Sequence, residues 1–110
     1  MLISALVLAL AAQASPTAAP QRAFVDCLED ELVSALDDRV QPDAFAAALK
    51  TKCTDQEAAY RAAMVRADRG AGIAQKDADE SAADEIAYWR DKFTAEYGDY
   101  FKDNARPGRR

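Results

Sequence analysis

The chain has 110 residues, of which 30% are charged, and a formal net charge of −5 at pH 7. This length accommodates one domain, and an acidic chain lacks the basic surface that neutralises phosphates, so we expect no nucleic-acid partner. The absence of histidine excludes Ser-His-Asp and Cys-His catalysis within the chain. Two cysteines supply only half of the usual zinc ligand set, so no metal or cofactor is expected.

The composition favours helices. Alanine is abundant, whereas glycine and proline occur four times each. Alanine loses no side-chain entropy on entering a helix. The β-branched residues are few and never adjacent in long runs, which gives strands little support. We therefore expect an all-α fold.

Residues 2–14 are predicted to be an export signal. They carry no charged side chain, and the first charge in the chain is Arg22. An apolar segment of this length is too short to span a bilayer comfortably and is typical of a signal sequence. Ala12-Gln13-Ala14 offers a small-x-small cleavage site, so we expect cleavage after Ala14, a periplasmic or secreted product and no stable membrane anchor afterwards. The segment lacks a basic residue at its start, and the alternative is a short apolar helix kept in the fold.

A helix is expected over residues 21–38, after a flexible linker over residues 15–20 that is rich in proline and alanine. Its apolar residues recur at spacings of three and four and form one stripe: Phe24, Cys27, Leu28, Leu32, Ala35 and Leu36. The opposite face is acidic and contains Asp26, Glu29, Asp30, Glu31 and Asp37. We interpret this face as a solvated surface, with docking of a basic partner as the alternative.

A second helix is expected over residues 43–52, with Pro42 at its start and Phe45, Ala48 and Leu49 facing inward. Thr54 and Glu57 fit a capping box, which predicts that a third helix begins directly after Cys53.

The third helical region covers residues 55–101 and is amphipathic. Gly70 and Gly72 weaken it by about 1 kcal/mol each relative to alanine. It forms either one long helix or two helices that break near residues 70–77. We favour the long helix because nothing between Ala71 and Ser81 forces a turn. The helical domain thus covers residues 21–103, and residues 104–110 form a disordered tail.

The cysteine spacing predicts a disulfide. Cys27 and Cys53 each lie thirteen residues from Val40, the centre of the connection between the first two helices. Both arms of an antiparallel helical hairpin rise about 1.5 Å per residue, so the two cysteines should lie at the same height. Export to an oxidising compartment supports the bridge over free thiols or a redox or metal-binding pair. We expect a hairpin closed by this disulfide and packed against a long C-terminal amphipathic helix.

Six of the nine aromatic residues fall within fourteen positions near the C-terminus, between Tyr88 and Phe101. The simplest interpretation is that they fill the core opposite the alanine-rich helices. The alternative is an apolar partner face formed by Tyr88, Trp89, Phe93, Tyr97 and Tyr100.

Four segments carry a resemblance to a known group. They are Cys27-Leu28, Ala-Leu-Lys-Thr-Lys-Cys at 48–53, Glu-Ala-Ala-Tyr-Arg at 57–61, and the helical stretch from Asp84-Glu85-Ile86 to Tyr97. These segments span most of the mature chain. Through them the chain resembles a group of short exported helical proteins of Alphaproteobacteria. That resemblance implies no activity, since none is known for the group.

No catalytic or cofactor-binding constellation is evident, so the protein is expected not to be an enzyme. A non-enzymatic interaction protein, chaperone-like or inhibitor-like, fits best. The alternatives are a carboxylate-only enzyme and binding of a divalent cation through Asp77, Asp79 and Glu80 or through Asp84 and Glu85. This acidic run lacks the glycine and the distal glutamate of an EF-hand loop.

Overall fold

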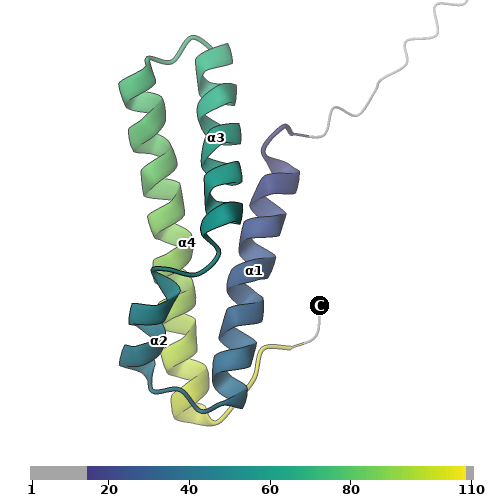
Figure 1. The fold of residues 1–110 in the computed structure, drawn as a ribbon, viewed down its shortest axis with the longest axis vertical. Coiled ribbons are helices and arrows are strands. Elements are labelled where there is room, and N and C mark those ends of the chain that lie inside the picture. Colours follow the sequence, from purple (N-terminus) through teal and green to yellow (C-terminus); the bar gives the residue numbers. More distant parts are fainter. Residues whose placement is uncertain (1–14, 109–110) are drawn as a thin grey trace, which may run out of the picture.

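The computed structural model describes residues 15–108, and within them it contains helices and no strand. The prediction of an all-α fold is confirmed. The helices are α1 (Ala18–Asp37), α2 (Pro42–Leu49), α3 (Thr54–Gly70) and α4 (Gln75–Asp103) (Figure 1). The predicted export signal, residues 1–14, lies outside the described residues.

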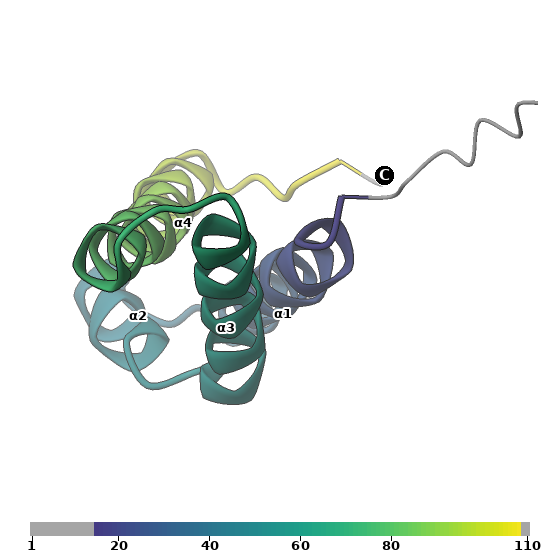
Figure 2. The same cartoon turned by 90° about the horizontal axis from the view of Figure 1, so that it is seen from above.

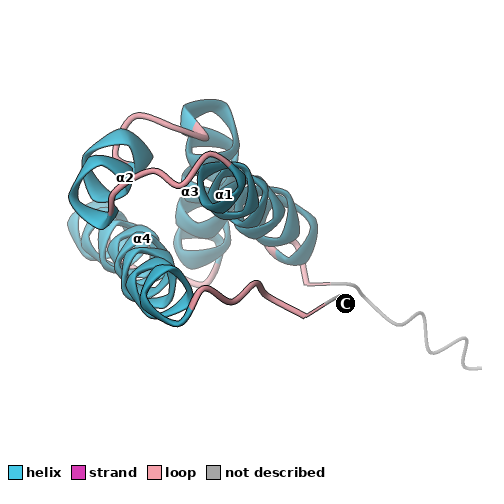
Figure 3. Cartoon of the chain, turned by 90° about the horizontal axis from the view of Figure 1, so that it is seen from below, coloured by secondary structure: helices cyan, strands magenta, loops and turns pink. Residues whose placement is uncertain are grey.

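Helix α4 organises the bundle and is its longest element, with 29 residues. It contacts the other three helices, with α3 beside its first half and the short α2 beside its second half (Figure 1). Figure 2, which looks along the bundle from above, shows α3 nearest the viewer and α2 farther away at the lower end (compare Figure 1). The loop from α1 to α2 crosses the lower end of the bundle (Figure 3). The predicted long C-terminal helix is therefore present and forms the common packing surface.

The core lies where the apolar stripes of the helices meet. Helix α1 contributes a buried residue at every fourth position from Phe24 to Leu36, as the sequence pattern predicts. The other buried large side chains are Val25, Phe45, Leu49, Tyr60, Ile86, Phe93 and Tyr97. Tyr97 is fully buried and stacks on Phe45 with ring centroids 3.9 Å apart, so α2 is fixed to α4 by an aromatic pair.

Two predicted helix boundaries are wrong. Helix α1 begins at Ala18, so Pro20 lies within its first turn, where its missing N–H leaves no hydrogen bond unmade. Part of the predicted linker thus belongs to the helix. Helix α2 ends at Leu49, three residues earlier than expected, so residues 50–52 form a loop that leads to Cys53. Cys53 is the N-cap of α3, which begins directly after it, as predicted.

The preference for one helix over residues 55–101 is also wrong, and the alternative of a break near residues 70–77 is correct. Gly72 has φ +87°, a left-handed conformation that glycine adopts without a Cβ clash. Its N–H donates to the carbonyl of Arg69 at 3.1 Å, and the N–H of Ile73 donates to the carbonyl of Asp68 at 3.0 Å. These two bonds satisfy terminal carbonyls of α3 in the manner of a Schellman motif, which ends the helix.

The predicted capping box does not form. Thr54 is already the first residue of α3, and the N-cap, Cys53, makes no side-chain capping bond. The carboxylate of Glu57 pairs instead with Arg90 on α4. A long-range ion pair has therefore replaced the expected local hydrogen bond between the Glu57 side chain and the backbone.

Candidate functional site

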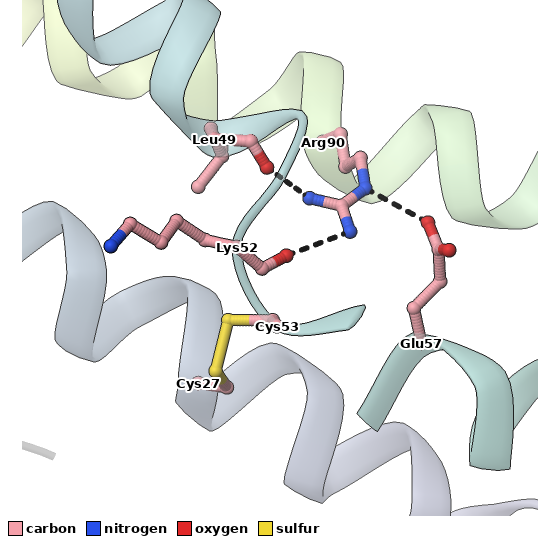
Figure 4. The surroundings of a disulfide bond; sticks show 6 residues. All are labelled: Cys27, Leu49, Lys52, Cys53, Glu57 and Arg90. Carbon is pink, nitrogen blue, oxygen red and sulfur yellow. Dashed lines mark hydrogen bonds and ion pairs between the residues drawn. A yellow bond between two sulfur atoms is a disulfide. The ribbon is translucent and has the colours of Figure 1, made fainter. Parts of the chain in front are cut away.

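Cys27 and Cys53 form the predicted disulfide, with Cα atoms 6.0 Å apart. The bridge does not join two helices side by side, however, because α2 is only eight residues long. It links the middle of α1 to the loop that enters α3 (Figure 4). Cys53 has φ +60°, an uncommon conformation for a residue with a Cβ.

Arg90 lies beside the disulfide and joins three elements (Figure 4). Its Nε donates to Oε1 of Glu57 at 3.0 Å, and its Nη2 donates to the carbonyl of Lys52 at 3.0 Å. Its Nη1 donates to the carbonyl of Leu49. The guanidinium carbon lies 5.3 Å from the centroid of the Phe24 ring, within cation–π range. These contacts assign Arg90 a structural role, since its donors point to the protein's own carbonyls and carboxylate.

Glu85 accepts two hydrogen bonds at one carboxylate oxygen. Trp89 Nε1 donates to Oε1 at 2.9 Å, and the hydroxyl of Tyr60 donates to the same atom at 3.1 Å. Burial, reinforced by the bond to Glu85 and by its negative charge, raises the pKa of Tyr60 to about 12. Tyr60 is therefore neutral at physiological pH and donates a hydrogen bond to Glu85. Glu85 is one of the residues considered for cation binding, and its Oε1 is already occupied by these two protein donors.

The aromatic residues proposed as a partner face are divided by the fold. Phe93 and Tyr97 are buried and belong to the core. Trp89 and Tyr100 are half-buried, and Tyr88 is 55% exposed. The rings of Tyr88 and Trp89 meet edge to face with centroids 5.4 Å apart. Of the five residues of the predicted partner face, Tyr88 and Trp89 are therefore the pair that presents adjoining aromatic rings at the surface.

Trp89 lines a depression of about 410 Å³ between α4 and the start of α1. The other lining residues all come from α1: Ala18, Gln21, Arg22, Val25 and Asp26. The Lys92 ammonium lies 5.1 Å from the centroid of the Trp89 ring. We call this depression, together with Tyr88 and Lys92, the Trp89 surface. Sequence reasoning missed the contribution of α1 because only the fold brings its first turns to Trp89.

A second, smaller cavity of about 230 Å³ lies between α1 and α2. Val40, Phe45 and Leu49 contribute apolar lining, and its charged residues are Glu31, Asp38 and Lys52. Its volume is below the several hundred Å³ typical of small-molecule sites. Of these two hollows, the depression at Trp89 is the larger and adjoins the exposed ring of Tyr88, so we take the Trp89 surface as the candidate functional site.

The acidic residues considered for cation binding, apart from Glu85, are exposed along α4: Asp77, Asp79, Glu80 and Asp84. Within residues 15–108, no three histidine, cysteine, aspartate or glutamate side chains are grouped so that they could hold a metal ion. None of the helices in this range combines the length and the hydropathy needed to cross a membrane.

Comparison with known proteins adds no relative to this description. No protein-family model matches the chain, and neither a curated protein nor a solved structure shows significant similarity to it.

Proposed function

We propose that the protein is a non-enzymatic interaction protein of the periplasm or the extracellular space, which binds a polypeptide partner on the Trp89 surface. The observation that carries this proposal is the exposed Tyr88 ring beside the half-buried Trp89. Tryptophan, tyrosine and arginine dominate the binding energy of protein interfaces, and Arg22 lines the same depression. The surface thus combines residue types that act as anchors at interfaces.

The proposed compartment rests on the cysteines and on the N-terminal sequence. Disulfides form and persist in oxidising compartments, and Cys27 pairs with Cys53. Cleavage after Ala14 is consistent with the fold, because α1 begins at Ala18 and would lose no residue. Membership of the exported alphaproteobacterial group that the sequence resembles is part of the same proposal.

An inhibitor-like module with one specific partner fits better than a chaperone with many clients. A chaperone needs a large exposed apolar patch. Among the described residues, the exposed large hydrophobic side chains are Ile73 and Tyr88, and they lie on different parts of the bundle. A small scaffold that is cross-linked before binding loses little conformational entropy on association.

The test starts with export of the full-length chain in a bacterial host. Mass spectrometry should find a mature protein that begins at Ser15 and is 2 Da lighter than its reduced form. Interaction partners are then captured from the same compartment by chemical cross-linking, with three forms of the protein compared: wild type, Tyr88→Ala and Ile73→Ser.

Ile73→Ser is the matched control, because it removes the other exposed apolar side chain at the α3–α4 turn. We expect wild type and Ile73→Ser to capture the same partner and Tyr88→Ala to lose most of it. Equal capture by Tyr88→Ala, or no specific partner for wild type, would contradict the proposal.

A further inference from the structure

The chain reverses direction directly after α4. Asn104 adopts a left-handed conformation with φ +52°, which asparagine tolerates better than most residues. The Ala105 N–H donates to the carbonyl of Tyr100 at 2.9 Å, and the Asn104 N–H donates to that of Phe101 at 3.3 Å. This turn ends α4 and sends the following residues back past α1 (Figures 1 and 2). Residues 104–108, which the sequence predicts to be disordered, are non-helical but follow a defined path.

The returning tail lies on α1 and α4. Nη2 of Arg106 forms an ion pair with Oδ1 of Asp37, the last residue of α1. Pro107 and Gly108 line a cavity of about 110 Å³ with residues of both helices: Glu29, Leu32, Phe93, Glu96 and Tyr100. We call these five residues together with Asp37 the tail groove. The tail groove is therefore already covered by a non-helical segment of the chain itself.

The groove and its occupant have complementary charges. The groove contains the carboxylates of Glu29, Asp37 and Glu96, of which Glu96 also lies 4.0 Å from Lys92. The tail carries Arg106 within the described residues, and its sequence continues with two further arginines. Arginine forms charge-assisted hydrogen bonds with carboxylates, so a chain segment rich in arginine is chemically suited to a surface lined by carboxylates.

The tail is held weakly enough to be displaced. The side chains of Arg106 and Asp37 are 61% and 47% exposed, and exposed ion pairs of this kind add little to stability. The bond is maintained chiefly because the tail is covalently tethered, which gives it an effective concentration on the order of millimolar. A separate peptide with the same chemistry and more contacts would compete with it.

We propose that the tail groove is a binding site for a basic, extended, proline-containing segment of a partner protein. The chain's own residues 105–108 occupy this site as an intramolecular competitor and set a threshold for the partner's affinity. The groove and the Trp89 surface adjoin at Lys92 and Glu96 but share no residue, so the two proposals are tested by different substitutions.

The experiment uses the full-length oxidised protein and a fluorescent peptide with the sequence of residues 104–110, Asn-Ala-Arg-Pro-Gly-Arg-Arg. Binding is measured by fluorescence anisotropy at low salt, where charge attraction is least screened. Arg106→Glu should replace the ion pair with Asp37 by repulsion between two carboxylates, so that the tail leaves the groove. We expect this variant to bind the peptide about two- to fivefold more tightly than wild type, since the tethered competitor is lost and an exposed ion pair is worth up to about 1 kcal/mol.

Asp37→Asn in the Arg106→Glu background should weaken peptide binding again. Asp84→Asn in that background is the charge-matched control, because Asp84 is exposed in the half of α4 beside α3. A peptide with its three arginines replaced by glutamate should not bind. Circular dichroism should show the same helical signal for all these surface variants as for wild type.

Equal peptide affinities for wild type and Arg106→Glu would overturn the proposal, as would equal effects of the Asp37 and Asp84 substitutions. Concentration-dependent dimerisation of the wild type in sedimentation, abolished by Asp37→Asn, would show that the occupant is a second copy's tail and would also overturn it.

Discussion

Arg90 donates a hydrogen bond of 3.0 Å from Nη2 to the backbone carbonyl of Lys52, the residue directly before Cys53. The loop that carries this cysteine is thus fixed on two sides. The disulfide joins it to Cys27 on α1, and the guanidinium joins it to α4. The two links restrain the same loop by independent means, one covalent and one polar.

Replacement of Arg90 by methionine should lower the free energy of unfolding by about 2–4 kcal/mol. The side chain of Arg90 is only 14% exposed, so the change leaves the Leu49 carbonyl and the Glu57 carboxylate without their donor in a partly buried place. The more exposed carbonyl of Lys52 can bond to water instead. Arg90→Lys keeps the charge but not the planar fork, and its loss should be smaller. Guanidinium unfolding of the oxidised proteins measures the free energy of unfolding of both variants.

Arg66→Met is the control for this series, since Arg66 is exposed on α3. It should change the free energy of unfolding by less than about 0.5 kcal/mol. If Arg90→Met were as mild as Arg66→Met, the guanidinium would not be holding the loop.

Local pattern was enough to predict the all-α fold, the core stripe of α1 and the cysteine pairing. The spacing of Phe24, Leu28, Leu32 and Leu36 follows the helical period, and each is buried. The break after α3 was also readable, because Gly72 followed by the apolar Ile73 is the pattern of a Schellman motif. Low helix propensity alone does not predict this stop. The decisive property of Gly72 is that it adopts a left-handed backbone conformation without a Cβ clash.

The contacts of Arg90 were not readable from sequence. Its acceptors at Leu49 and Lys52 are main-chain carbonyls, which every residue type provides. The end of α2 has no glycine or proline to mark it, and Glu57 had a plausible local use as a capping residue. Both candidate surfaces depend on side chains from α1 and α4 that only the folded bundle brings together.

Gly72→Ala should destabilise the protein by about 1 kcal/mol, because alanine at φ +87° meets its own backbone. The cost is local, since a Cβ at this position would have no atom within 4 Å. Gly70→Ala is the matched control two residues away. It lies inside α3 with equally open surroundings, so the higher helix propensity of alanine should leave stability unchanged or raise it by up to about 1 kcal/mol. Thermal unfolding should show a lower midpoint for Gly72→Ala and an equal or higher midpoint for Gly70→Ala. An unchanged or raised midpoint for Gly72→Ala would contradict a helix stop at Gly72.

Removal of the disulfide by Cys27→Ala with Cys53→Ala should cost about 3.5 kcal/mol, the chain entropy of a loop whose ends are 26 residues apart. A second variant with glycine at position 53 should recover roughly 1 kcal/mol, since φ +60° strains a residue with a Cβ. Denaturant unfolding measures both losses. If the glycine variant were no more stable than the alanine variant, position 53 would have left its left-handed conformation once the bridge was gone.

The pKa of Tyr60 predicts how stability changes at high pH. Its pKa is about 12 in the folded protein and about 10 in the unfolded chain. Below pH 10 the phenol is neutral in both states, and its contribution to stability is fully present. Between pH 10 and pH 12 the unfolded chain loses this proton while the folded protein keeps it. Rising pH therefore favours unfolding, by roughly 2–3 kcal/mol at the upper end of this window.

Tyr60→Phe removes the ionisable group and should flatten this decline, although it also loses the hydrogen bond to Glu85 and starts from a lower stability. Burial also raises the pKa of Tyr97, so some decline should persist in the variant. Urea unfolding at pH 9, 10 and 11 gives the two slopes. The described residues contain no free cysteine to start disulfide exchange at these pH values. Lysine ionisation is common to both proteins, so the difference between their slopes of unfolding free energy against pH is due to Tyr60. Parallel slopes would mean that its hydroxyl ionises as readily in the folded protein as in the unfolded chain.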